Sequence, residues 1–174
     1  MYMKKLFAIA IISIFCYSCT VDESTEVIKK AELTTFILVR HAEKGNDDPR
    51  NPSLNEEGIQ RAEKLLQMIS PSKIDAVYSS PYKRTEQTVS DIAAKYGVEI
   101  TEYNPSSTDF VASAMEKHAG KMILVSGHSN TTPSLANYLT STEDFQQLDE
   151  SEYDKVFIIS LSEIGKASVV VLSY

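Results

Sequence analysis

Short apolar runs alternate with amphipathic stretches over most of the chain. Three of the runs contain little polar alternation, which is typical of strands buried on both faces of a sheet. They lie at 34–39 (TTFILV), 74–78 (IDAVY) and 121–125 (KMILV). Between them, apolar residues recur at helical spacing, most clearly after Asn55, the expected N-cap of a helix that Pro71 ends. This alternation predicts an α/β fold.

The remaining patterns complete the prediction. Helices are expected at 82–96, 109–118 and 132–139, and a weaker strand at 98–103. Two apolar runs, 156–162 and 167–172, flank a short turn and indicate an antiparallel hairpin. We therefore expect a three-layer α/β/α sandwich with a mainly parallel central sheet and an antiparallel C-terminal hairpin.

The first residues have the pattern of a secretory signal. Lys4 and Lys5 precede an uncharged apolar run at 6–15, which is shorter than the roughly 20 residues that span a bilayer. Cys19 follows the small residue Ser18 and resembles the lipidated cysteine of bacterial lipoproteins, although Cys16 stands where leucine is usual. We interpret 1–18 as a signal peptide, 19–33 as a lipidated N-terminus and tether, and 34–174 as one domain. A soluble secreted protein is the alternative.

Charge narrows the classes of partner. The chain has 24 acidic and 17 basic residues and a formal net charge of −7, and loss of Lys4 and Lys5 would make it more negative. Such a surface repels nucleic acid, so none is expected as a partner. A site for an anion would need a local concentration of basic side chains, which makes clustered arginines and histidines informative.

Three segments at the ends of predicted strands carry such side chains. They are 38–44 (LVRHAEK), 78–88 (YSSPYKRTEQT) and 124–130 (LVSGHSN). Ligands of parallel sheets bind beyond the carboxyl ends of the strands, so these segments are expected to meet. In order, spacing and placement they resemble the histidine phosphatase superfamily, with its phosphoglycerate mutase-like fold, over residues 34–172. Ala42 stands where the family usually has glycine.

The resemblance implies a role for each charged group. His41 would be the nucleophile that carries the phosphoryl group, and Arg40, Arg84 and His128 would hold the phosphate oxygens. These charges would stand in for a metal ion, so neither a metal nor a cofactor is expected. Asn130 either donates to substrate or caps the next helix. Lys44 and Arg50 either face substrate or are ordinary exposed basic residues.

The general acid is the least determined role. Family members commonly supply it from an acidic residue after the third strand, and Glu102 in the Ile-Thr-Glu segment is the nearest match. Asp109 and Glu43 are rivals. Each of the three carboxylates is also explained as an ordinary surface residue.

These features predict a metal-independent phosphatase, exported and anchored by lipid on Cys19, facing the periplasm or the cell surface. Its expected partner is a phosphorylated small molecule, bound in an open, shallow site, because 99–121 leaves no room for a large cap. The alternatives are a phosphohistidine phosphatase and a catalytically idle phosphate-binding lipoprotein. The sequence leaves the natural substrate, the oligomeric state and the membrane open.

Overall fold

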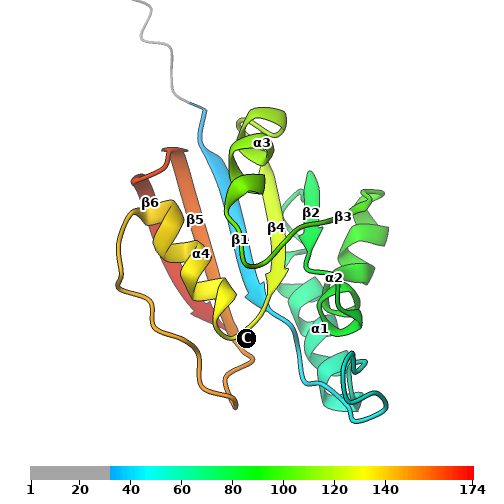
Figure 1. Ribbon diagram of the computed structural model, residues 1–174. Coiled ribbons are helices and arrows are strands. Elements are labelled where there is room, and N and C mark those ends of the chain that lie inside the picture. Colours follow the sequence, from blue (N-terminus) through cyan, green and yellow to red (C-terminus); the bar gives the residue numbers. More distant parts are fainter. Residues whose placement is uncertain (1–31) are drawn as a thin grey trace, which may run out of the picture. The chain divides into compact units, whose positions relative to one another are not determined.

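The computed structural model describes residues 32–174, so the predicted signal peptide and lipidation site lie outside the described residues (Figure 1). Ten elements follow one another: β1 (Thr34–Arg40), α1 (Glu56–Ile69), β2 (Ala76–Ser79), α2 (Lys83–Tyr96), β3 (Ile100–Glu102), α3 (Asp109–Lys117), β4 (Met122–Gly127), α4 (Thr131–Thr140), β5 (Lys155–Glu163) and β6 (Lys166–Ser173). The predicted elements and their order are confirmed, with boundaries that shift by a few residues.

The six strands form one sheet in the order β3-β2-β4-β1-β5-β6. Strands β1 to β4 pair in parallel, whereas β5 runs antiparallel to β1 and β6 antiparallel to β5. The C-terminal hairpin therefore occupies one edge of a mainly parallel sheet, as predicted (Figure 1).

Helices cover both faces of this sheet. Leu65 of α1 and Val89 of α2 pack on one face, while Val111 of α3 and Leu139 of α4 pack on the other. Strand β1 supplies both cores, because its alternate side chains point to opposite faces. Burial on both faces explains why its sequence shows no polar alternation, and it confirms the three-layer architecture.

The first turn of α1 lies in close contact with the segment that follows β1. The side chain of Asn55 accepts a hydrogen bond from the Gly58 amide at 2.8 Å, which confirms the predicted cap. A Cβ atom at Gly58 would overlap the carbonyl oxygen of Glu43. Glycine is thus required for this approach, which fixes the backbone just after the predicted nucleophile.

Strands β1, β2 and β4 end at the same edge of the sheet. Arg40 lies beside Gly127, and Ser79 lies beside Ser126. The three segments singled out by the sequence therefore leave the sheet as neighbours (Figure 1). Across residues 32–174, none of the helices combines the length and the apolar character needed to cross a bilayer.

Candidate active site

The sheet edge brings together all four basic residues that the sequence assigned to phosphate. The amide of His41 donates to the carbonyl of Gly127 at 2.9 Å, and the rings of His41 and His128 lie 5.5 Å apart between centroids. A guanidinium nitrogen of Arg84 lies 3.5 Å from Nδ1 of His128. Arg40 precedes His41 at the end of β1. Three segments distant in sequence thus form one cationic cluster.

The hydrogen bonding of His41 fixes its tautomer. Its Nδ1 lies 2.7 Å from the carbonyl oxygen of Ala42, which can only accept, so Nδ1 carries the proton and Nε2 carries the lone pair. Burial is the main cause that lowers the pKa of His41 to about 3; the hydrogen bond to Ala42 opposes this shift, and the charges of Arg84 and Arg40 add to it. At neutral pH this side chain is therefore an uncharged base, as a nucleophile must be.

The alanine in place of the usual glycine fits this geometry. Ala42 is fully buried, and its amide donates to the Thr88 hydroxyl at 2.9 Å. Within residues 32–174, Ser141 is the sole non-glycine residue with a positive φ, so the backbone at Ala42 does not need the freedom of glycine.

A chain of hydroxyl groups orients His128. Its Nε2 lies 2.9 Å from Oγ of Ser80, which donates its own proton to Oγ1 of Thr85 at 3.1 Å. His128 therefore donates through Nε2, and its Nδ1 accepts from Arg84. Burial, followed by the charges of Arg84 and Arg40, lowers the pKa of His128 to about 4. The Ser-Ser-Pro motif was recognised in the sequence, but the role of Ser80 in orienting this histidine was not.

Arg84 is placed by the start of α2. Its guanidinium lies over the Tyr82 ring, 4.5 Å from the centroid, and this ring also meets His128 edge-on at 5.0 Å. The buried Nε of Arg84 has no hydrogen-bond partner among the described residues. This donor is available to an anion between the two histidines and α2.

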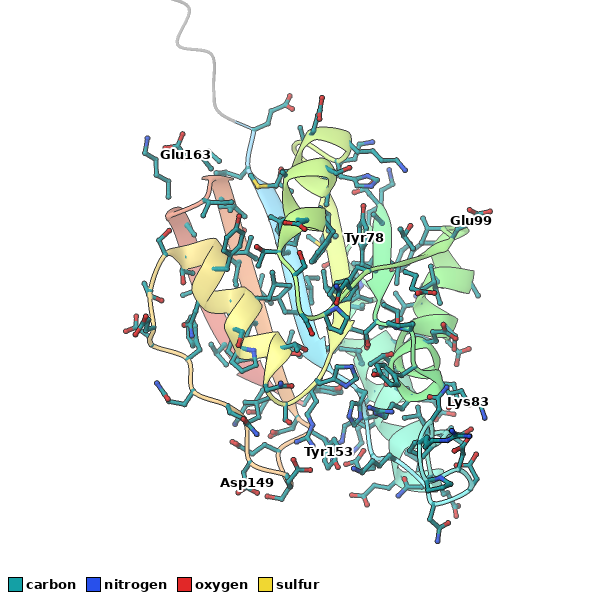
Figure 2. All side chains as sticks on the ribbon, viewed as in Figure 1. Tyr78, Lys83, Glu99, Asp149, Tyr153 and Glu163 are labelled. Atoms are coloured by element: carbon teal, nitrogen blue, oxygen red, sulfur yellow. The ribbon has the colours of Figure 1, made fainter. Side chains whose placement is uncertain are left out.

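Arg40 has a second function that the sequence did not reveal. Its Nη1 donates to the carbonyl oxygens of Asp149 and Glu152, at 2.7 and 2.9 Å, and its guanidinium stacks on Tyr153 at 4.0 Å. Figure 2 shows Asp149 and Tyr153 on the segment between α4 and β5, at this edge of the sheet. The buried Nε of Arg40 lacks a hydrogen-bond partner within residues 32–174. Arg40 thus holds this segment and keeps one donor for a ligand.

The structure does not bring the predicted acids to the cluster. Glu102 and Asp109 are exposed, and their side chains make no hydrogen bond or ion pair with other described residues. Glu43 is buried, but its carboxylate is held by Arg61, with Nε of the arginine 2.7 Å from Oε1. Within residues 32–174, Glu150 is the one acidic residue that forms an ion pair with the cluster: its Oε2 lies 3.4 Å from Nη2 of Arg40. The role of Glu102 stays a prediction.

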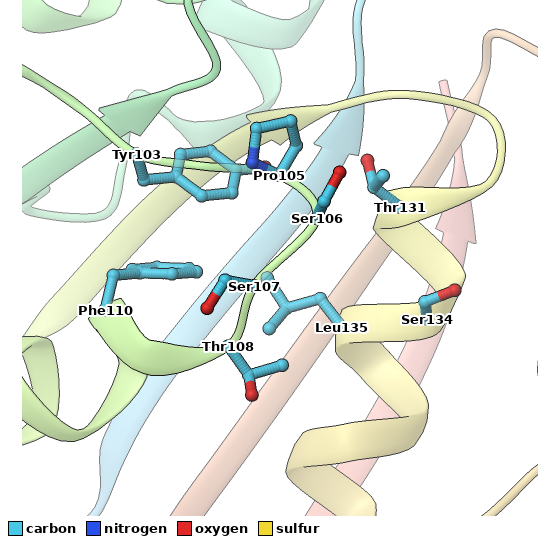
Figure 3. Close-up of a pocket in the computed structure, with 9 residues that line it drawn as sticks. All are labelled: Tyr103, Pro105, Ser106, Ser107, Thr108, Phe110, Thr131, Ser134 and Leu135. Carbon is cyan, nitrogen blue, oxygen red and sulfur yellow. The ribbon is translucent and has the colours of Figure 1, made fainter.

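The segment after β3 instead lines a small cavity of about 110 Å³ beside α4 (Figure 3). Its lining side chains carry no formal charge; they include Tyr103, Phe110 and Thr131. The Thr131 hydroxyl accepts from the amide of His128 at 3.0 Å, which connects this cavity to the cluster. Asn130 is exposed at the start of α4 and makes no capping hydrogen bond through its side chain. Its contact with substrate stays a prediction.

Within the described part of the chain, no three side chains of histidine, cysteine, aspartate or glutamate converge as metal ligands do. Positive charge at this edge of the sheet comes from Arg40 and Arg84.

Sequence comparison matches residues 36–104 to the family described as the histidine phosphatase superfamily (branch 1). Phosphoserine phosphatase 1 of Hydrogenobacter thermophilus is 39% identical over 74 residues. That alignment spans 39% of this chain and only 35% of the relative. The family match at residues 36–104 contains His41 and Arg84 but ends before His128.

Solved structures resemble the fold over a longer stretch. A protein histidine phosphatase, SixA, complexed with tungstate has a TM-score of 0.66 at 16% identity, covering 80% of this chain and 96% of its own. A phosphoserine phosphatase from Entamoeba histolytica in complex with 3-phosphoglyceric acid has a TM-score of 0.64 at 15% identity, covering 81% and 97%. The sequence match thus covers the first part of the described domain, and the solved structures share the fold over a longer stretch of the chain.

Proposed function

We propose that this protein is a metal-independent phosphatase that hydrolyses phosphate monoesters through a phosphohistidine on His41. The observation that carries the proposal is the state of this imidazole. Its Nδ1 proton is committed to the Ala42 carbonyl, and its pKa of about 3 keeps Nε2 unprotonated beside two arginines. A buried, neutral imidazole aimed by its backbone and surrounded by positive charge suits attack on phosphorus.

The reaction then divides into two displacements. In the first, the Nε2 lone pair forms a bond to phosphorus while the bond to the ester oxygen breaks. In the second, water attacks phosphorus, the N–P bond breaks, and Nε2 recovers its lone pair as inorganic phosphate forms. In each transition state the negative charge is spread over three equatorial oxygens, and the free Nε donors of Arg40 and Arg84 are available to bind them.

Substrates fall into two classes according to whether their leaving oxygen needs a proton from a general acid. None of the acids expected from the sequence contacts the cluster, and Glu150 is bound to Arg40. This arrangement favours substrates whose leaving group needs little help from an acid, such as aryl phosphates. It also supports phosphohistidine as a second candidate substrate, a class on which the SixA neighbour acts by its name.

Hydrolysis of para-nitrophenyl phosphate tests the proposal. We expect turnover that His41→Ala abolishes and that a chelator leaves unchanged. A matched variant, His118→Ala, removes the histidine that lies outside the cluster and should retain activity. Equal activity of the wild-type protein and His41→Ala would contradict the proposed nucleophile. Absence of turnover with phosphate binding retained would favour the idle, phosphate-binding alternative.

We also propose export and lipid anchoring through Cys19. The support comes from the sequence, namely the basic start, the apolar run at 6–15 and the cysteine that follows it. Cys19→Ser should move the protein from the membrane fraction to the soluble fraction, whereas Cys16→Ser should not. An unchanged membrane fraction for Cys19→Ser would contradict the anchor.

A further inference from the structure

A second cavity adjoins the cationic cluster. It has a volume of about 360 Å³ and lies between the start of α2 and the loop at 44–52. Arg84 lines this cavity and also contacts His128, so its guanidinium borders both the cavity and the cationic cluster. A substituent on a phosphate bound by Arg84 would therefore lie next to this space.

Two of the lining residues are cations without an internal partner. Lys44 and Arg50 are both exposed, and neither side chain forms an ion pair or hydrogen bond within residues 32–174. The two cations lie in the same lining as Arg84, in a chain with a net charge of −7. Unpaired cations gathered in a cavity attract an anion against the general field of the protein.

The acidic residues of the same loop offset only part of this charge, because the cavity is lined by three cations and one carboxylate. Asp48 also lines the cavity, but one carboxylate oxygen accepts from the amides of Arg50 and Asn51, at 2.9 and 3.2 Å. Its other oxygen lies 4.0 Å from Nζ of Lys83. Asp47 accepts from the amide of Ser53 at 2.9 Å. Both carboxylates therefore serve the fold of the loop.

The loop is held in place rather than free to vary. The side chain of Asn51 accepts from the amide of Lys83 at 2.9 Å, and Gln87 accepts from the amide of Leu54 at 2.8 Å. Two hydrogen bonds thus tie the loop to α2 beside Arg84. Figure 2 marks Lys83 at the start of α2, on the side of the edge away from Tyr153.

We propose that this cavity is a subsite for an anionic substituent on the leaving group, so that the preferred substrates are phosphate esters carrying a carboxylate or a second phosphate. This inference rests on the proposed phosphatase function. Lys44 and Arg50 bind the substituent, and Arg84 lies between it and the phosphoryl group. The subsite contributes specificity, because an uncharged leaving group leaves the two cations without a partner.

The test compares two aryl phosphates that differ in one group opposite the phosphate, a carboxylate or an uncharged carboxamide. Two exposed ion pairs correspond to a preference of about tenfold in kcat/KM for the carboxylate. The double variant Lys44→Gln, Arg50→Gln should bring the ratio close to one. Lys64→Gln, which removes an exposed charge on α1, should leave the ratio unchanged.

The outcomes separate this inference from the function on which it rests. Turnover of both esters at equal rates by the wild-type protein overturns the subsite and leaves the phosphatase standing. A preference that survives in the double variant also overturns it, because the selectivity then arises elsewhere. No turnover of either ester overturns both proposals. Higher ionic strength should reduce a genuine preference.

Discussion

Residues 44–54 and residues 148–154 border the same sheet edge, because β5 begins beside the end of β1, where Val156 pairs with Val39. The first segment contains acidic and basic residues together, whereas the second is strongly acidic. In the first, the carboxylates of Asp47 and Asp48 accept backbone amides, which leaves Lys44 and Arg50 without partners. In the second, backbone carbonyls hold the guanidinium of Arg40.

The formal charge of a segment therefore does not determine which charged group is available to a ligand. The 44–54 loop presents cations although it contains aspartates. The 148–154 segment is acidic, but it holds the Arg40 guanidinium mainly through backbone carbonyls. Within this segment, Glu150 alone places a carboxylate against Arg40. The hydrogen-bond and ion-pair partners of each charged group determine whether it is available to a ligand. Variants in each segment test this.

The largest effect is expected from Arg40, because it holds the acidic segment and, in the proposed mechanism, also binds the phosphoryl group. Arg40→Gln should lower kcat by about a hundredfold or more. It should also lower the free energy of unfolding by about 3 kcal/mol, since two carbonyl oxygens lose a charged donor. Arg84→Gln should lower activity similarly but the unfolding free energy by less than about 1 kcal/mol. Kinetics and urea denaturation check both; equal stability losses would contradict the distinct role of Arg40.

Gly58 in α1 and Gly45 in the 44–54 loop differ in how closely other atoms approach them. A Cβ at Gly58 would overlap the backbone of Glu43, whereas one at Gly45 would meet ordinary contacts at 3.5 Å. Gly58→Ala should therefore lower the unfolding free energy by about 2 kcal/mol and reduce kcat by shifting His41. Gly45→Ala should change stability by less than about 0.5 kcal/mol. Equal denaturation midpoints for the two variants would show that α1 does not constrain this backbone.

Much of this arrangement was predictable from the sequence. The buried strand runs gave the parallel sheet, and the rule that ligands bind beyond strand ends placed His41 and His128 together. The link from Arg40 to residues 149–152 was not predictable, because it uses backbone carbonyls that any sequence supplies. The motif around Glu102 suggested an acid, but its exposure depends on how β3 lies at the sheet edge.

The buried histidines between the two segments predict how stability responds to pH. The pKa of His41 is about 3 in the folded protein, below its ordinary value of 6.5, so the unfolded chain takes up the proton first. Stability should therefore fall as pH drops from 6.5 toward 3, by about 2 kcal/mol for His41 at pH 4.5. Urea denaturation at pH 6.5 and 4.5 should show a smaller loss for His41→Gln than for wild type. The same loss in both would contradict the low pKa.

The smallest effect is expected at Glu150, which is 74% exposed and lies 3.4 Å from Arg40, where it would compete with a bound phosphate. Glu150→Gln should strengthen inhibition by inorganic phosphate by about two- to threefold, as expected for one exposed ion pair. Glu143→Gln removes the same charge from a residue that does not pair with Arg40 and serves as the control. Weaker inhibition in Glu150→Gln would indicate that the carboxylate assists binding instead of competing.

Trapping the phosphoenzyme identifies the residue that accepts the phosphoryl group. Rapid mixing with an aryl phosphate, followed by quenching in base, should preserve one phosphoryl group per chain, because N–P bonds survive base and are lost in acid. Peptide mass spectrometry should locate this group on His41, and ³¹P NMR should show attachment at Nε2. Phosphate on His128, on another residue, or on no residue during active turnover would contradict the proposed nucleophile.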